Sequence, residues 1–416
     1  MKPPRITKPY AAFLAVLLLS GFDCRSAGTT GSQNETGRAK TGAVETTQAE
    51  TKQTETGQNP VPEETVVTLL AAGDNLIHDI IYLAARVDAD RYDFDPSYSR
   101  IKAVVEKADI AMVNQETVLG GTALGLSGYP VFNSPQETGT ALANAGFNVV
   151  NHASNHTMDR GEKAVTATMD FWDAFNENRE EKVLYLGIFR SGEERETKKN
   201  IITKKGVRFG FLSYTYGLNG FSLPAGKDWL VGIIDPEVMA REIDALRPDC
   251  DVLVVSMHWG DEFRHTVSET QKKLAAFLAG HAVDLVIGHH PHMTQPCEII
   301  PRPDGKTLTC YYSLGDFLSH TQTDYSPDTM LGAMAWVTVT KRGLGAESEV
   351  SVKTAGIIPT VCHYGKGRRP PFTVYPLWDY TEELAAQHYK SEKISLEYLY
   401  RVSREIFGMR MLERVP

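Results

Sequence analysis

Side chains that can bind metal ions stand at the ends of several short apolar runs in this chain of 416 residues. The runs have the composition of buried strands, and core packing does not require the polar residues that follow them. In chain order these residues are Asp74 and His78, Asn114 and Glu116, Asn155 and His156, His258, and then His290 and His292. Open α/β sheets bind ligands at the carboxyl ends of their strands, so we expect these side chains to share one site. The alternative is an accidental clustering of histidines, of which the chain has 12.

Two of these pairs have a spacing that lets both side chains serve one site. Asn114 and Glu116 lie two residues apart, so on an extended segment both point to the same face. His290 and His292 have the same spacing across Pro291, whose ring stiffens the loop between them. Each pair is therefore predicted to present its side chains from one rigid element.

The donor types indicate which metal ions such a site would hold. Imidazole and carboxylate groups together suit manganese, iron or zinc better than calcium, and the lack of cysteine donors argues against a closed structural zinc site. The candidate ligands predict two divalent transition-metal ions; they are Asp74, His78, Glu116, Asn155, His258, His290 and His292. Two ions about 3.5–4 Å apart can activate a water molecule and stabilise both the entering and the leaving oxygen of a displacement. The chemistry expected is therefore hydrolysis.

The elements that position these residues alternate along the chain. Apolar runs of strand type cover residues 66–72, 110–113, 147–150, 252–257 and 284–287, and stretches with helical spacing cover 101–107, 162–175, 236–246 and 268–279. Residues 201–214 and 307–317 instead suggest pairs of strands joined by short turns. We therefore predict an α/β fold, a layered sandwich with two mixed β-sheets flanked by helices.

The two ends of the chain differ in composition from the middle. Residues 1–23 combine early positive charges with an apolar run of signal-peptide length, and predict a signal peptide or an uncleaved anchor. Cys24 stands where a lipidated cysteine would, and residues 24–64 are polar enough to predict a disordered tether. Residues 65–365 are the expected domain, and residues 366–416 a helical C-terminal appendage. The domain is thus expected outside the cytoplasm, tethered to the membrane by lipid or anchor, with simple secretion as the alternative.

Charge and cysteine content restrict the partners and the cross-links. The net charge of −9 gives no reason to expect nucleic acid, whose binding rests on clustered Lys and Arg. An even number of cysteines follows the tether, as suits an oxidising compartment: Cys250, Cys297, Cys310 and Cys362. Cys297 and Cys310 flank a turn signal at residues 303–305 and would lie roughly opposite each other in a hairpin. The sequence leaves two interpretations open, a disulfide between these two residues or two separate buried thiols.

The motifs around these residues resemble the CapA family of capsule or poly-γ-glutamate synthesis proteins, whose fold is that of the calcineurin-like metallophosphoesterases. The resemblance runs from about residue 65 to residue 363 and rests on GDNLIH (73–78), NQE (114–116), NHTMDRG (155–161), HWGDE (258–262), GHHPH (288–292) and YSLGDF (312–317), in family order. It implies metal ligands at Asp74, Glu116, Asn155, His258, His290 and His292. It also implies that His156 is the acid assisting the leaving group, with Glu262 as a second catalytic residue and Asn114 as a substrate-binding residue. Asp159 and Gly161 would form a cap and a turn for the following helix.

The chain departs from the family pattern at three places. His78 stands four residues after Asp74, where the wider fold has an aspartate-x-histidine pair, which leaves ligation by His78 open. Asp316 stands where the family usually has asparagine, and residues 114–116 replace the Gly-Asp motif of the phosphoesterases. Activity toward phosphate esters therefore does not follow from the resemblance alone.

Three functions fit these observations. The leading hypothesis is a metal-dependent hydrolase at the cell surface that acts in capsule or poly-γ-glutamate synthesis, export or processing. The alternatives are an exported phosphoesterase and a non-catalytic subunit for capsule assembly. The expected partners are an anionic polymer such as poly-γ-glutamate, the membrane, and a capsule synthase complex.

Overall fold

The computed structural model describes residues 64–320, 326–343, 348–367 and 369–415. The predicted signal peptide or anchor, Cys24, and the tether up to residue 63 lie outside the described residues. Among the helices that are described, none combines the length and the apolar character that crossing a membrane requires.

The first β-sheet is built around β1 (Glu64–Asn75). On one side of β1 the strands are parallel to it and follow in chain order: β2 (Ile110–Gln115), β3 (Val149–Asn151) and β4 (Leu184–Leu186). On the other side they are antiparallel to their neighbours: β12 (Leu331–Arg342), β13 (Glu349–Tyr364) and β14 (Phe372–Pro376). A short strand, β11 (Asp316–Leu318), pairs in parallel with the carboxyl end of β1.

The second β-sheet has a parallel centre and antiparallel edges. Its central strands are β6 (Val207–Thr215), β7 (Val252–His258), β8 (Leu285–His289) and β10 (Thr307–Tyr311). The edge strands are β5 (Ile201–Lys204), which pairs with β6, and β9 (Cys297–Pro301), which pairs with β10. Both sheets are therefore mixed, as the sequence predicted.

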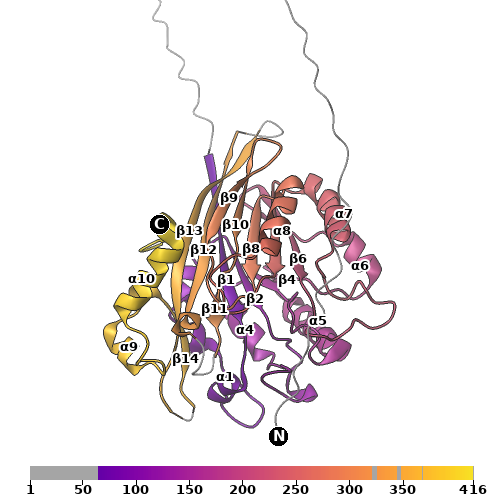
Figure 1. Ribbon diagram of the computed structural model, residues 1–416. Helices are drawn as coiled ribbons and strands as arrows, with labels where there is room; N and C mark the ends of the chain where they lie inside the picture. The colour runs from indigo at the N-terminus through magenta and orange to yellow at the C-terminus, as the bar shows by residue number, and fades with distance from the viewer. Residues whose placement is uncertain (1–63, 321–325, 344–347, 368, 416) are drawn as a thin grey trace, which may run out of the picture. The chain divides into compact units, whose positions relative to one another are not determined.

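Apolar side chains join the two sheets face to face, with helices on their outer faces (Figure 1). Along β1, Val67, Leu69 and Ala71 enter the core between the sheets, while Leu70 and Ala72 enter the core under the helices. This alternation is the two-residue period of a strand that is buried on both faces. The predicted fold class, two mixed sheets flanked by helices, is confirmed.

Helices cover the two sheets in separate groups. The core on the outer face of the first sheet includes side chains of α1 (Asp79–Ala84), α2 (Asp95–Tyr98), α3 (Lys102–Val105), α4 (Glu137–Asn144) and α5 (Gly161–Asn176). The core on the outer face of the second sheet includes α7 (Pro236–Leu246) and α8 (Glu269–Gly280), and α6 (Gly192–Thr197) precedes β5. The C-terminal helices α9 (Glu382–Gln387) and α10 (Leu396–Phe407) lie beside β13 (Figure 1). They pack on Leu331 and Val361, and β14, which precedes them, extends the first sheet.

Two local predictions differ from the structure. The helix expected over residues 101–107 is only the four-residue α3. The strand pair expected within residues 307–317 does not form, because β10 belongs to the second sheet and β11 to the first. The chain crosses between the sheets at this point, which carries Asp316 to the end of β1.

The hairpin around residues 303–305 does form, but its cysteines are not bonded to each other. In the β9–β10 register Cys297 lies opposite Tyr311, and Cys310 lies opposite Glu298. This offset of one residue sends the two thiols to opposite faces of the sheet, where they join different apolar cores. The structure therefore shows Cys297 and Cys310 as two separate thiols and not as a disulfide.

Candidate metal centre

The carboxyl ends of strands from both sheets meet at one place. In the first sheet Asp74 on β1 lies in register with Asn114 on β2 and with Asp316 on β11. In the second sheet His258 on β7 lies in register with His289 on β8. Parallel strands of one sheet end at the same edge of that sheet. The polar residues at the strand ends of the first sheet therefore lie close to those of the second sheet, at one end of the apolar core that the two sheets share.

Gly73 allows the close approach that adds β11 to this edge. A β-carbon at Gly73 would lie 2.0 Å from the carbonyl oxygen of Gly315, which no real contact permits. The backbone N–H of Asp74 donates to that same oxygen at 2.8 Å. The lack of a side chain at Gly73 therefore lets Asp316 reach the site.

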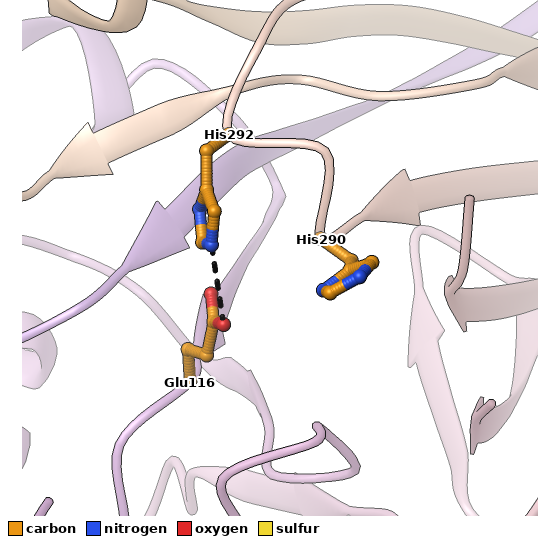
Figure 2. A group of neighbouring side chains, drawn as sticks. All are labelled: Glu116, His290 and His292. Carbon is orange, nitrogen blue, oxygen red and sulfur yellow. Dashed lines mark ion pairs between the residues drawn. The ribbon is translucent and has the colours of Figure 1, made fainter. Parts of the chain in front are cut away.

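Among the residues that the structure describes, three overlapping groups of carboxylate and imidazole side chains could each hold a metal ion. They are Glu116, His290 and His292; Asp74, Glu116 and His258; and Asp74, His292 and Asp316, and within each group the ligand atoms lie within 4.8 Å of one another. Glu116 links two of these groups, with its Oε1 atom 3.6 Å from His258 Nε2 and 3.8 Å from His292 Nε2. Figure 2 shows the imidazole rings of His290 and His292 and the Glu116 carboxylate around a common space.

Buried polar atoms of the cluster lack hydrogen-bond partners within the protein. Glu116 is 1% exposed, yet neither of its carboxylate oxygens accepts a hydrogen bond. His290 Nδ1 and Asp316 Oδ2 are also buried and unpaired. Burying such atoms costs free energy unless they gain a partner, and a cation between them would be that partner. The residues present therefore fit a divalent metal ion.

Burial and neighbouring charges set the protonation states in the cluster. Burial lowers the pKa of His258 well below its usual value, and also lowers the pKa of His290, to about 3. Both rings are thus neutral at pH 7, and a neutral imidazole has a nitrogen lone pair with which it can bind a metal ion. Burial also acts to raise the pKa of Asp74, but hydrogen bonds to His289 and His292 outweigh it and hold this pKa well below the usual range.

The loop that follows β8 carries two candidate ligands in an unusual backbone conformation. His290 and His292 have φ angles of +97° and +56°, which L-residues rarely adopt. The His290 N–H donates to Asp74 Oδ2 at 3.1 Å, and His292 Nδ1 lies 2.9 Å from Asp316 Oδ1. These bonds leave His292 Nε2 facing Glu116. Strained backbone of this kind is frequent at functional sites.

The two candidate asparagines play different parts in the geometry. Asn155 places its Oδ1 atom 2.9 Å from His258 Nε2, beside the cluster. Asn114 donates from Nδ2 to Asp74 Oδ1 at 2.8 Å and accepts at Oδ1 from Asn151 Nδ2 at 2.6 Å. The Asn114 carboxamide is therefore already engaged within the protein, where it holds the Asp74 carboxylate in place.

His156, the predicted acid, is oriented by an aspartate. His156 Nδ1 lies 2.7 Å from Asp159 Oδ2, which also accepts the Phe132 N–H at 2.7 Å. With Nδ1–H donated to this carboxylate, Nε2 is the ring nitrogen left for a substrate. The expected helix-cap role of Asp159 is wrong, because α5 is preceded by Arg160, which makes no side-chain cap bond. Gly161 does have the positive φ of a turn, +69°.

The two remaining predicted residues lie at the margin of the cluster. The His78 ring contacts Phe132 and His320, at centroid distances of 5.0 and 5.9 Å, and burial lowers its pKa to about 3. His78 belongs to none of the three metal-binding groups found among the described residues. Glu262 is exposed on the loop after β7, and its charge contributes to raising the pKa of Glu116, although burial is the main cause of that rise.

Three residues that the structure places at the site were not predicted from the sequence to belong to it: Asp316, His289 and Asp159. Asp316 belongs to one metal-binding group, and His289 Nδ1 lies 3.3 Å from Asp74 Oδ1. Asp159 lies three residues after His156, and this spacing was the only signal available for the pair. His289 was inconspicuous because it is the last residue of a buried strand.

Fold and site together define an α/β protein of two packed mixed sheets with a candidate metal centre at the strand ends. The chain belongs to the bacterial capsule synthesis protein family PGA_cap, whose family model matches residues 68–321, more than half of the chain. The resemblance to CapA proteins is thereby confirmed.

Two relatives carry names from the same process. The chain is 31% identical over 192 residues to the capsule biosynthesis protein CapA of Bacillus anthracis, covering 45% of this chain and 43% of that protein. It is 28% identical over 185 residues to the PGA biosynthesis protein CapA of Bacillus subtilis (strain 168), covering 44% and 45%. The match thus spans less than half the length of either relative.

Nucleotidases are among the solved structures to which the chain is similar. The NAD nucleotidase NadN of Haemophilus influenzae aligns with a TM-score of 0.42 at 12% identity, over 82% of this chain and 68% of that one. A 5′-nucleotidase precursor from Thermus thermophilus aligns with a TM-score of 0.40 at 13% identity, over 70% and 55%. These scores are low, so the fold class rests on the strand order and not on this likeness.

Proposed function

We propose that this chain is a metal-dependent hydrolase of the bacterial cell surface that acts on poly-γ-glutamate during capsule synthesis, export or processing. Membership of the capsule synthesis family supports the process. The observation that carries the hydrolase proposal is the buried Glu116 carboxylate, which lies among imidazole groups with neither oxygen hydrogen-bonded. Burying this carboxylate without partners costs free energy that a bound metal ion would offset, and a metal ion at this position is what the proposed hydrolysis requires.

The proposed cofactor is a pair of divalent transition-metal ions, of manganese, iron or zinc. The residues that would hold them are those of the three groups described above, Asp74, Glu116, His258, His290, His292 and Asp316, with Asn155 beside them. When bound, such ions supply Lewis acidity and lower the pKa of a coordinated water molecule. His156 would donate a proton to the leaving group from Nε2 while Asp159 holds the ring in place.

The proposed location is the outer face of the cell membrane. The charged start, the apolar run and Cys24 support export and attachment by lipid. A Cys24→Ser protein should move from the membrane fraction to the soluble fraction of fractionated cells. If Cys24→Ser stays with the membrane, an uncleaved N-terminal segment is the anchor instead.

The test of the function is metal analysis of the purified protein, followed by incubation with poly-γ-glutamate and, separately, with p-nitrophenyl phosphates. We expect bound transition metal and shortening of the polymer, and a Glu116→Gln variant should lose both. Turnover of phosphates without polymer cleavage would instead identify an exported phosphoesterase. Bound metal with no turnover of either would leave the non-catalytic assembly subunit as the better interpretation.

A further inference from the structure

A short loop outside every predicted motif contacts the candidate metal centre. The loop covers residues 216–220 and follows β6. Its residue Asn219 accepts a hydrogen bond at Oδ1 from Asn155 Nδ2, at 3.2 Å. Asn219 Nδ2 lies against the imidazole ring of His156, 3.4 Å from Nδ1 and 3.5 Å from Nε2. One carboxamide thus faces both the candidate ligand Asn155 and the candidate acid His156.

The backbone holds this carboxamide in place through a tight turn. Asn219 and Gly220 both have positive φ angles, +50° and +84°, and the Phe221 N–H donates to Leu218 O at 2.8 Å. Positive φ at both central positions is the pattern of a type I′ turn, for which Asn-Gly is the favoured pair. At its start the loop is fixed to β7, because the Tyr216 N–H donates to His258 O at 2.9 Å.

The contact with Asn219 determines which way the Asn155 carboxamide points. Only the amide nitrogen of Asn155 can donate to Asn219 Oδ1, so its oxygen must point the other way. That oxygen, Asn155 Oδ1, is the atom that lies 2.9 Å from His258 Nε2 at the cluster. Were the amide turned around, an N–H group, which cannot ligate a metal ion, would face the cluster.

We propose that Asn219 is a positioning residue of the metal centre, which orients the Asn155 oxygen toward the metal ion. The inference rests on the proposed metal centre but not on the reaction or the substrate. The competing explanation is that asparagine is present only because it tolerates the positive φ of the turn. Glycine tolerates that φ at least as well, so Asn219→Gly keeps the turn and removes only the carboxamide.

The test measures the Mn²⁺ dissociation constant of the full-length protein by competition with a chelator. Asn219→Gly should bind Mn²⁺ about 10–100-fold more weakly than the wild type, the usual effect of losing a group that orients a ligand. Asn219→Asp keeps an acceptor for Asn155 Nδ2, so its affinity should not fall. Ser222→Ala, an exposed position of the same connection, is the matched control and should bind as the wild type does.

A double-mutant cycle makes the test independent of folding effects. An Asn155→Asp side chain presents oxygen in either orientation, so in that background Asn219→Gly should change the dissociation constant by much less than in the wild type. A wild-type dissociation constant in Asn219→Gly, or an equal loss in both backgrounds, overturns the proposal. If the wild type binds Mn²⁺ and cleaves nothing, the proposed function fails while this cycle still decides the role of Asn219. If the wild type binds no metal, both fail.

Discussion

His152 should make the segment that carries Asn155 and His156 sensitive to acid. Its ring is buried, and Nε2 accepts a hydrogen bond from Trp172 Nε1 of α5 at 2.7 Å. Burial lowers the pKa of His152 from 6.5 to about 3, so the folded protein keeps this ring neutral. Protonation would charge a buried group and remove the acceptor of the Trp172 N–H.

The sign and the size of the effect follow from these two pKa values. Between pH 6.5 and pH 3 the unfolded chain binds a proton at His152 that the folded protein does not, so stability is complete above pH 6.5 and falls as pH falls. At pH 4.5 the loss amounts to about 2.7 kcal/mol, since each pH unit corresponds to about 1.4 kcal/mol. A loss of this size is a large part of the roughly 5–15 kcal/mol that stabilises an ordinary domain.

The assay is urea unfolding of the metal-free protein at pH 7 and pH 4.5, for the wild type and for His152→Gln. Glutamine offers Trp172 an acceptor but does not titrate, whereas every other ionisable group remains in both proteins. The variant should therefore lose about 2.7 kcal/mol less than the wild type between the two pH values. Equal losses in the two proteins would show that His152 is not held neutral, and would refute the reasoning.

Three further variants test the metal centre and the strand end that carries it. Replacing His290 and His292 together with alanine should remove most bound transition metal and leave the fold intact; unchanged metal content would contradict the site. His156→Ala should keep its metal but lower the hydrolytic rate by about 10²–10⁴. An unaffected rate would show that His156 is not the acid, and normal polymer production by cells that carry the variant would favour the scaffold interpretation. Gly73→Ala should destabilise the protein by at least about 1–3 kcal/mol in urea unfolding, because its β-carbon would meet a carbonyl oxygen at 2.0 Å. Gly280→Ala, with nothing within 4 Å, is its control and should be neutral or stabilising.

The residues that form the cluster could largely be predicted from the sequence, because their signal is local. Each apolar run is long enough to define a strand, and the polar residues after it have no part in the core. Strand ends in an α/β fold meet at one edge, so Asp74, Glu116 and His258 could be grouped without coordinates. The two-residue spacing of His290 and His292 likewise predicted that both belong to one site, although their positive φ angles could not be foreseen.

Contacts between segments far apart in the chain were decided only by the tertiary structure. Asp316 joins the cluster because the chain crosses from one sheet to the other beside Gly73, and nothing near Asp316 in the sequence indicates that crossing. Asn219 reaches Asn155 from 64 residues away through a turn at the end of another strand. The thiols of Cys297 and Cys310 are separated by a strand register offset of one residue. Composition and periodicity report what each segment buries, whereas register, crossings and turn positions depend on the packing of the whole chain.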